Sequence, residues 1–181
     1  MTSRGRLGVL AAACVALAAC SSSSVQPTGP NVEMTPASPA GVEAHLRSLA
    51  SAVTGKVRVI DRRDGVTVLV SAINLPPGQY RIAFHERANC SSPNGFSAGN
   101  PWAPASAGRA ATEIAPTLFT NADGTAEDSV FIRGVHVSGP DGVSGRSVVI
   151  HTGNQVTQAQ PDVRNNRVAC GIFEPATPFG F

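Results

Sequence analysis

The chain has 181 residues, of which 42% are hydrophobic and only 14% are charged, with 18 Gly and 14 Pro. This composition excludes a coiled coil, a long-helix protein and a highly charged disordered chain, and it favours one compact, turn-rich β domain. The net charge of +2 comes from Arg4 and Arg6, which lie in an export signal that is removed. The mature chain is therefore near neutral, and we expect no nucleic-acid partner.

The first 19 residues are typical of a lipoprotein signal peptide. The apolar run over 7–19 is shorter than the roughly 20 residues that a membrane-spanning helix needs. It ends in Leu17-Ala18-Ala19-Cys20, which resembles a bacterial lipobox whose cysteine thiol receives a diacylglycerol. An ordinary signal peptide that leaves Cys20 free is the alternative, but the serines at 21–24 are typical of a polar tether. We therefore expect a bacterial envelope lipoprotein, extracytoplasmic (periplasmic or surface), whose partner is the membrane through lipid on Cys20.

Residues 20–41 are rich in Ser, Pro, Thr and Gly, and they cannot bury enough apolar surface to offset the entropy of ordering. They should form a flexible tether between the membrane and a domain over 42–181.

Two cysteines remain once Cys14 is discarded with the signal and Cys20 is lipidated. In an oxidising compartment Cys90 and Cys170 should pair. Such a bond closes a loop of about 80 residues, for which a chain-entropy model gives roughly 4 kcal/mol of stabilisation. Two free thiols acting as metal ligands are the alternative, and no CxxC spacing supports it.

Apolar residues recur with a period of two along the body of the chain, which predicts β-strands. The ambiguous segment 42–53 fits an edge strand, although it also fits a helical stripe. A turn at 61–65 and another at 121–124 separate strands. In 80–85 the alternation puts Arg81, Ala83 and His85 on one face and large apolar residues on the other. The predicted strands are 56–60, 66–72, 80–85, 129–132, 135–137 and 147–151. Two long segments, 91–117 and 152–166, have no strand pattern, and such loops are usually functional.

Seven motifs occur in the order and approximate spacing of the bacterial copper/zinc superoxide dismutases, and the resemblance covers residues from about 44 to 173. They are Gly55-Lys56-Val57, Leu75-Pro76-Pro77-Gly78, Phe84-His85-Glu86, Ser97-Ala98-Gly99-Asn100-Pro101, Asn121-Ala122-Asp123-Gly124-Thr125-Ala126, Gly145-Arg146-Ser147-Val148-Val149-Ile150-His151 and Arg167-Val168-Ala169-Cys170-Gly171-Ile172.

The resemblance implies an all-β Greek-key barrel of about eight strands, whose two long loops form an active-site channel outside the barrel. It also implies a Cys90–Cys170 disulfide. His85 and His151 match two of four copper ligands, and Arg167 matches the channel arginine that attracts superoxide. The two histidines should face each other beside Arg167, close enough for one Cu(I).

The other metal ligands of the family are missing. Ala83 stands where the first copper histidine would be, and the histidine that bridges copper and zinc is deleted between Gly99 and Asn100. Residues 101–120 contain no His and no Asp, so this loop cannot supply the roughly four donors of a zinc site. Where the family has a carboxylate that orients the metal ligands, this chain has Asn154-Gln155. Copper is therefore the one cofactor to consider, and no zinc is expected.

Four further residues have weaker signals. His136 lies in an alternating segment and should face solvent, and His45 has no partner in the sequence. Trp102 should fill space left by the shortened loop, although an exposed Trp can also anchor a partner. Arg81 replaces a glycine on the face of His85, and we expect its cation beside the old copper position, where it would disfavour a metal.

Three interpretations remain open. The first is a degenerate family member that acts as a binding or structural module and not as an enzyme. The second is a copper-binding protein, or a weak copper-only dismutase, that uses His85 and His151. The third is a working enzyme that takes missing ligands from elsewhere, such as His136 or a partner chain. The sequence indicates no protein partner.

Overall fold

The computed structural model describes residues 41–49, 52–159 and 165–176. The predicted signal peptide over 1–19 and residues 20–40 of the predicted tether lie outside the described residues. The last residue of the predicted tether, Gly41, is already the first residue of the first strand. Within these described ranges, no helix is long and apolar enough to cross a membrane.

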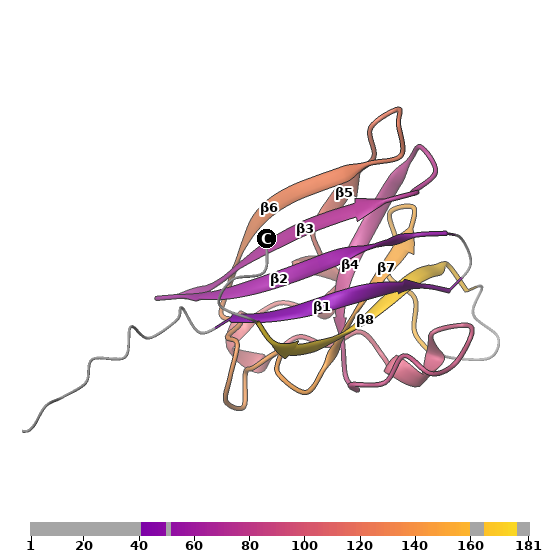
Figure 1. The fold of residues 1–181 in the computed structure, drawn as a ribbon. Coiled ribbons are helices and arrows are strands. Elements are labelled where there is room, and N and C mark those ends of the chain that lie inside the picture. Colours follow the sequence, from indigo (N-terminus) through magenta and orange to yellow (C-terminus); the bar gives the residue numbers. More distant parts are fainter. Residues whose placement is uncertain (1–40, 50–51, 160–164, 177–181) are drawn as a thin grey trace, which may run out of the picture. The chain divides into compact units, whose positions relative to one another are not determined.

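Eight antiparallel strands form one sheet in the order β5-β4-β7-β8-β1-β2-β3-β6 (Figure 1). Because β4 and β5 pair on the far side of β7 and not beside β3, the connections cross over as in a Greek key. The two end strands, β5 and β6, contact each other and nearly close the barrel. The predicted all-β barrel is confirmed. The strands are β1 Gly41–Ser48, β2 Thr54–Arg62, β3 Gly65–Ile73, β4 Gln79–His85, β5 Thr117–Phe119, β6 Ala126–Arg133, β7 Ser147–Thr152 and β8 Arg167–Pro175.

Alternate residues of each strand fill the barrel, as the period of two predicts. On β4, Tyr80, Ile82 and Phe84 are buried in the main core cluster, and the Phe84 ring packs on Phe173 of β8 with centroids 5.8 Å apart. The opposite face of β4 and β7 carries His85 and His151 and is covered by loops. These loops contain the only helices among the described residues, namely η1 Phe96–Ala98, η2 Ala105–Ala107 and α1 Ala111–Ile114.

The prediction of a strand over 42–53 is confirmed for 42–48, but its place at an edge of the sheet is wrong. The strand β1 ends at Ser48 and lies inside the sheet, paired with β2 on one side and β8 on the other. The reason is topological, because the last strand of the chain returns to lie beside the first.

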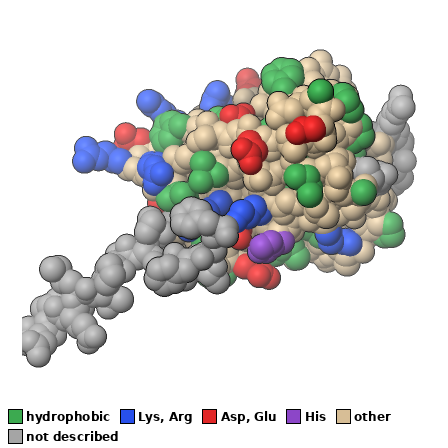
Figure 2. Space-filling view, turned by 45° about the horizontal axis from the view of Figure 1, so that its top comes forward, with side chains coloured by type: hydrophobic (Ala, Val, Ile, Leu, Met, Phe, Trp, Pro, Cys, Tyr) green, Lys and Arg blue, Asp and Glu red, His purple; other side chains and the backbone are tan. Residues whose placement is uncertain are grey.

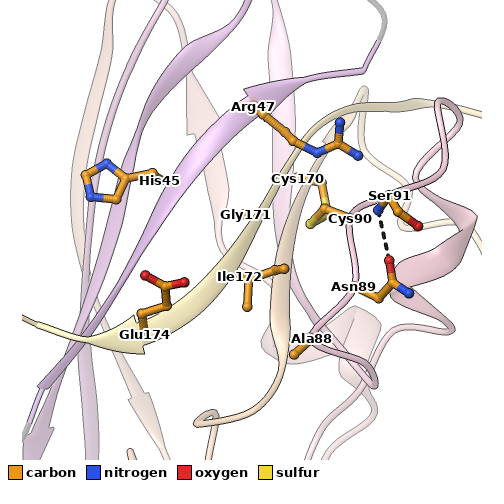
Figure 3. A pocket seen from close by; sticks show the side chains of 10 residues that line it. All are labelled: His45, Arg47, Ala88, Asn89, Cys90, Ser91, Cys170, Gly171, Ile172 and Glu174. Atoms are coloured by element: carbon orange, nitrogen blue, oxygen red, sulfur yellow. Dashed lines mark hydrogen bonds between the residues drawn. A yellow bond between two sulfur atoms is a disulfide. The ribbon is translucent and has the colours of Figure 1, made fainter.

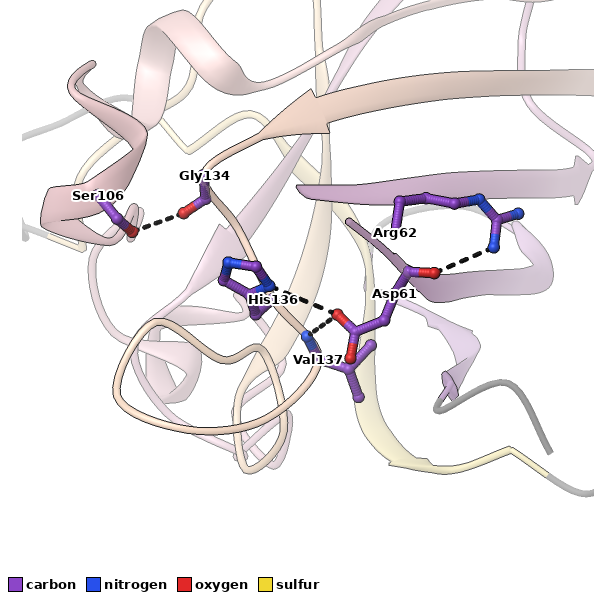
Figure 4. Close-up of polar contacts among 6 residues, drawn as sticks. All are labelled: Asp61, Arg62, Ser106, Gly134, His136 and Val137. Atoms are coloured by element: carbon purple, nitrogen blue, oxygen red, sulfur yellow. Dashed lines mark hydrogen bonds and ion pairs between the residues drawn. The ribbon is translucent and has the colours of Figure 1, made fainter. Parts of the chain in front are cut away.

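The predicted strand at 135–137 is also absent. Val135 and Val137 are buried, but the backbone here forms a loop in which the N–H of Val137 donates to the carboxylate of Asp61 (Figure 4). Only one isolated bridge, between His136 and Gly142, has strand-like pairing. The alternating apolar pattern therefore reflects burial of two valines in a loop.

Cys90 and Cys170 form the predicted disulfide, which ties the loop after β4 to the middle of β8 (Figure 3). Both cysteines are buried, and they lie at one side of a pocket of about 420 Å³ that Arg47 and Ile172 also line. A disulfide is typical of an oxidising, extracytoplasmic compartment.

Candidate functional site: a buried histidine pair

Two imidazoles meet on the outer face of the barrel. His85 is the last residue of β4, and His151 lies on the neighbouring β7, four register positions along. Their Nε2 atoms are 3.1 Å apart, and their rings lie nearly parallel, 18° between planes. Both side chains have no solvent exposure. The sheet register therefore brings together two side chains that are 66 residues apart in the chain.

Hydrogen bonds on the far side of each ring hold its orientation. His85 Nδ1 lies 3.0 Å from the carbonyl oxygen of Gly99, which can only accept, so Nδ1 carries the proton. His151 Nδ1 lies 2.9 Å from Asn166 Oδ1, and the amide of Asn166 donates to two carbonyls through its nitrogen. The same Nδ1 lies 3.4 Å from the backbone N–H of Thr157, which can only donate. The two Nε2 atoms lie within hydrogen-bond distance of each other, so a proton on either of them forms a hydrogen bond to the other.

The surroundings oppose protonation of the pair. The pKa of His85 is lowered to about 3. Burial is the larger cause, and the nearby positive charge of Arg167 contributes to the same shift. Burial likewise lowers the pKa of His151 to about 4, although the hydrogen bond to Asn166 partly offsets this effect. Two imidazolium ions could not face each other at this distance. The pair is therefore neutral at physiological pH.

Arg167 is the cation of the site, and its side chain is only 1% exposed. One Nη donates to the carbonyl of Gly95 at 2.8 Å, and the other donates to the carbonyls of Gly99 and Thr157 at 3.0 and 2.9 Å. A register shift between Ile150 and His151 places Arg167 opposite His151. Burial lowers the pKa of Arg167 to about 10, so the guanidinium remains charged at neutral pH.

Gly95 and Gly99 present their carbonyls through backbone conformations with positive φ, 73° and 81°. A Cβ on Gly95 would lie 2.6 Å from the Leu49 side chain, and one on Gly99 would lie 2.8 Å from the Glu86 carboxylate. A positive φ and a close neighbour at the position of the Cβ are both met at low cost only by glycine. The loop after β4 is thus shaped to hold the guanidinium.

Both long loops close over the pair. The N–H of Ala159 in the second loop donates to the Asn100 side chain in the first, at 3.1 Å. Trp102 is half-buried against the barrel core, and the guanidinium of Arg146 lies 3.6 Å from the centre of its indole. Trp102 therefore fills space between the loop and the barrel, as the sequence predicts.

The comparison with known proteins agrees with this geometry. A family model described as copper/zinc superoxide dismutase matches residues 53–173. The chain belongs to this family. A superoxide dismutase [Cu-Zn] from Caulobacter vibrioides is 30% identical over 140 residues, which are 66% of this chain and 78% of that protein.

The family implies copper, and the donor set suits only one of its oxidation states. Two neutral imidazoles whose Nε2 atoms face each other fit low-coordinate Cu(I), which would displace any proton between them, whereas Cu(II) and zinc require about four donors. Among the described residues, no group of three or more His, Cys, Asp or Glu side chains could hold a metal ion. The 3.1 Å separation is also shorter than the roughly 4 Å spanned by two opposed metal–imidazole bonds. An ion between the rings would have to move them apart or lie off their axis.

Arg81 pairs with His151 in the sheet register and shares the face of His85, as the alternation predicts. Its Nη2 donates to the carbonyls of Thr112 and Ala115, both at 2.6 Å, so the guanidinium is held by α1 and the residue that follows it. The cation whose charge lowers the pKa of both imidazoles is Arg167.

The remaining two histidines each have an acidic neighbour. His136 is 3.8 Å from Asp61, and its side chain is 40% exposed (Figure 4). His45 lies on β1 with its side chain 80% exposed, 3.3 Å from Glu43.

Sequence reasoning missed Asn166 and Thr157. Thr157 accepts Arg167 through its carbonyl and donates its hydroxyl to Asn166 Oδ1 at 2.8 Å. The only available signal was the place of Asn166, directly before the motif that begins at Arg167.

Proposed function

We propose that this protein is a lipoprotein of the bacterial cell envelope whose superoxide dismutase-like barrel acts as a binding or structural module and has lost dismutase catalysis. The observation that carries the proposal is the sealed pair of imidazoles, which offers two donors where the family's copper site has four. Dismutation requires copper to alternate between Cu(II) and Cu(I) with an open position for the anion. His85 and His151 supply half of the donors that Cu(II) needs.

The state of Arg167 supports the same proposal. Attraction of superoxide requires a positive charge that reaches the channel. Here both Nη atoms of Arg167 donate to backbone carbonyls, and the side chain is almost fully buried. The guanidinium binds the two loops together and does not point at solvent.

The decisive experiment is a dismutation assay of the purified mature protein after loading with copper. Copper that a mild chelator removes is stripped first, because free copper itself dismutates superoxide, and rates are expressed per retained copper. We expect a rate on the order of 1,000-fold or more below that of the Caulobacter enzyme assayed in parallel. A rate within about tenfold of that enzyme would overturn the proposal.

Cu(I) binding is a second candidate function, favoured by the convergence of the two Nε2 atoms. The outer hydrogen bonds to Gly99 and Asn166 hold both rings in the orientation that a metal ligand requires. Cu(I) bound between the two imidazoles would be stored there or would be available for one-electron chemistry. The residues themselves contribute orientation, exclusion of water and, through Arg167, a neighbouring positive charge that weakens cation affinity.

Anaerobic titration with Cu(I) against a competing chelator tests this candidate. We expect one Cu(I) per chain, lost in the His85→Ala/His151→Ala double variant. The chain offers a matched control, because His45→Ala/His136→Ala removes the only other two histidines. Retention of Cu(I) by the first variant, or its loss from the second, would contradict the assignment. Circular dichroism establishes that each variant is folded.

A further inference from the structure

We propose that the end of the barrel at which the chain enters β1 docks on anionic phospholipid headgroups, through Arg62, Arg63 and Arg133. This inference rests on the proposed lipidation of Cys20, which would keep that end of the domain near a bilayer. The three arginines are called the basic tip below.

The sheet register places the basic tip beside the point of entry. Gly41, the first residue of β1, pairs with Ile60, and β2 ends only two residues later at Arg62. Arg62 pairs with Gly65 across the tight turn, and Gly65 pairs with Arg133 at the end of β6. Neighbouring strands lie about 4.8 Å apart, so these residues share one end of the sheet. Figure 1 shows the β2–β3 turn at the left, and Figure 2 shows Lys and Arg side chains at the same edge with an Asp or Glu side chain among them.

The basic tip has charges available for a partner. All three arginines are exposed, and within the described part of the chain none of them forms a salt bridge with a carboxylate. Arg62 makes only a hydrogen bond to the backbone carbonyl of Asp61 (Figure 4). Guanidinium groups bind phosphate with two parallel hydrogen bonds, which suits phospholipid headgroups.

Two carboxylates, Asp61 and Asp64, lie near the basic tip and offset part of its charge. Asp61 accepts the N–H of Val137 at 2.8 Å and faces His136, so hydrogen bonds hold it away from the arginines while it keeps its charge. Three arginines against two aspartates leave the basic tip a net charge of +1. The mature chain as a whole is near neutral, so no general attraction to polyanions is expected. The net positive charge is therefore local to the basic tip.

An exposed aromatic side chain adjoins the tip. Phe131 precedes Arg133 by two residues, so both point to the same face of β6, and Phe131 is 50% exposed. Arginine beside an exposed aromatic ring is a combination found at membrane interfaces. Three charges alone bind a bilayer weakly, but a tether raises the effective concentration enough for a weak contact to form.

The test compares the acylated full-length product in vesicles of phosphatidylcholine with the same protein in vesicles that also contain phosphatidylglycerol. Backbone hydrogen exchange is the readout. We expect amides of residues 61–65 and 133–134 to exchange at least about threefold more slowly in the anionic vesicles, and the difference to vanish in high salt. The Arg62→Gln/Arg63→Gln variant should lose this protection. The Arg47→Gln/Arg87→Gln variant makes the same charge change near the pocket beside the disulfide and should keep it.

Equal exchange in both vesicle types, or protection centred elsewhere on the barrel, would overturn the proposal. Failure of the lipoprotein assignment is detected separately, by the mass of the Cys20 peptide. If that peptide carries no lipid, the Cys20→Ala chain is sedimented with both kinds of vesicle. Binding that depends neither on phosphatidylglycerol nor on Arg62 and Arg63 then rejects the basic tip, whatever the state of Cys20.

Discussion

Arg167 and His85 donate to the same acceptor, the carbonyl oxygen of Gly99, each at 3.0 Å. This shared carbonyl couples the cation of the site to the tautomer of His85. Any change that moves the loop at Gly99 therefore affects both groups together.

Removal of the guanidinium should destabilise the fold. Arg167→Ala leaves the carbonyls of Gly95, Gly99 and Thr157 without this donor in a buried site, and each unsatisfied group costs about 1–3 kcal/mol. We expect the free energy of unfolding, measured in urea, to fall by about 3 kcal/mol or more. Arg109→Ala, at an exposed position, should change it by less than about 0.5 kcal/mol. Equal effects of the two variants would show that the carbonyl contacts contribute little.

Acid should destabilise the protein through the histidine pair. Burial and Arg167 lower the pKa of both imidazoles, so the folded pair binds at most one proton where the unfolded chain, with pKa values near 6.5, binds two. Unfolding thus takes up protons below pH 6.5. Stability should fall by at least about 1.4 kcal/mol per pH unit as the pH drops from about 6 to 4.

Denaturant titrations at several pH values measure this slope. The His85→Gln/His151→Gln variant should have a shallower slope over this range, and His45→Gln/His136→Gln should retain that of the wild type. A site variant with an unchanged slope would mean that carboxylates account for the acid sensitivity.

The disulfide should contribute strongly to stability, because it closes a loop between residues 80 positions apart. Cys90→Ser/Cys170→Ser is expected to lower the free energy of unfolding by about 2–5 kcal/mol. Wild-type protein in excess reductant should approach the value of the variant. Two thiols that react with an alkylating agent in native, unreduced protein would refute the pairing in solution.

Membrane attachment should depend on Cys20. The Cys20→Ala variant should leave the membrane fraction, and the wild-type peptide that begins at Cys20 should carry an acyl adduct by mass spectrometry. Cys14→Ala is the matched control, since Cys14 lies in the predicted signal peptide. Continued membrane association of Cys20→Ala without any adduct would rule out lipidation at this residue.

The purified protein should hold no stoichiometric zinc. Residues 101–120 contain no His and no Asp, and a structural zinc site requires about four donors. Elemental analysis after dialysis should find less than about 0.1 zinc per chain, while a zinc-loaded member of the family treated in the same way keeps its metal. One tightly held zinc per chain would mean that the loop is misaligned with the family.

The sequence by itself determined which residues could take part in this site. Strict alternation in 80–85 puts His85 on the face opposite Ile82 and Phe84, because successive side chains of a strand point to opposite sides. The sequence also shows Ala at position 83 and no bridging histidine, because the residue type at each position is read without any structure. Cysteine counting gave the Cys90–Cys170 pair, which the structure confirms.

Only the tertiary structure decided how those residues are used. The place of β1 inside the sheet depends on the return of β8, a pairing between distant segments that local pattern does not encode. The tautomer of His85 and the burial of Arg167 depend on backbone carbonyls of Gly95, Gly99 and Thr157. Every residue has such a carbonyl, so its role follows from loop geometry and sheet register, and residue type alone does not reveal it.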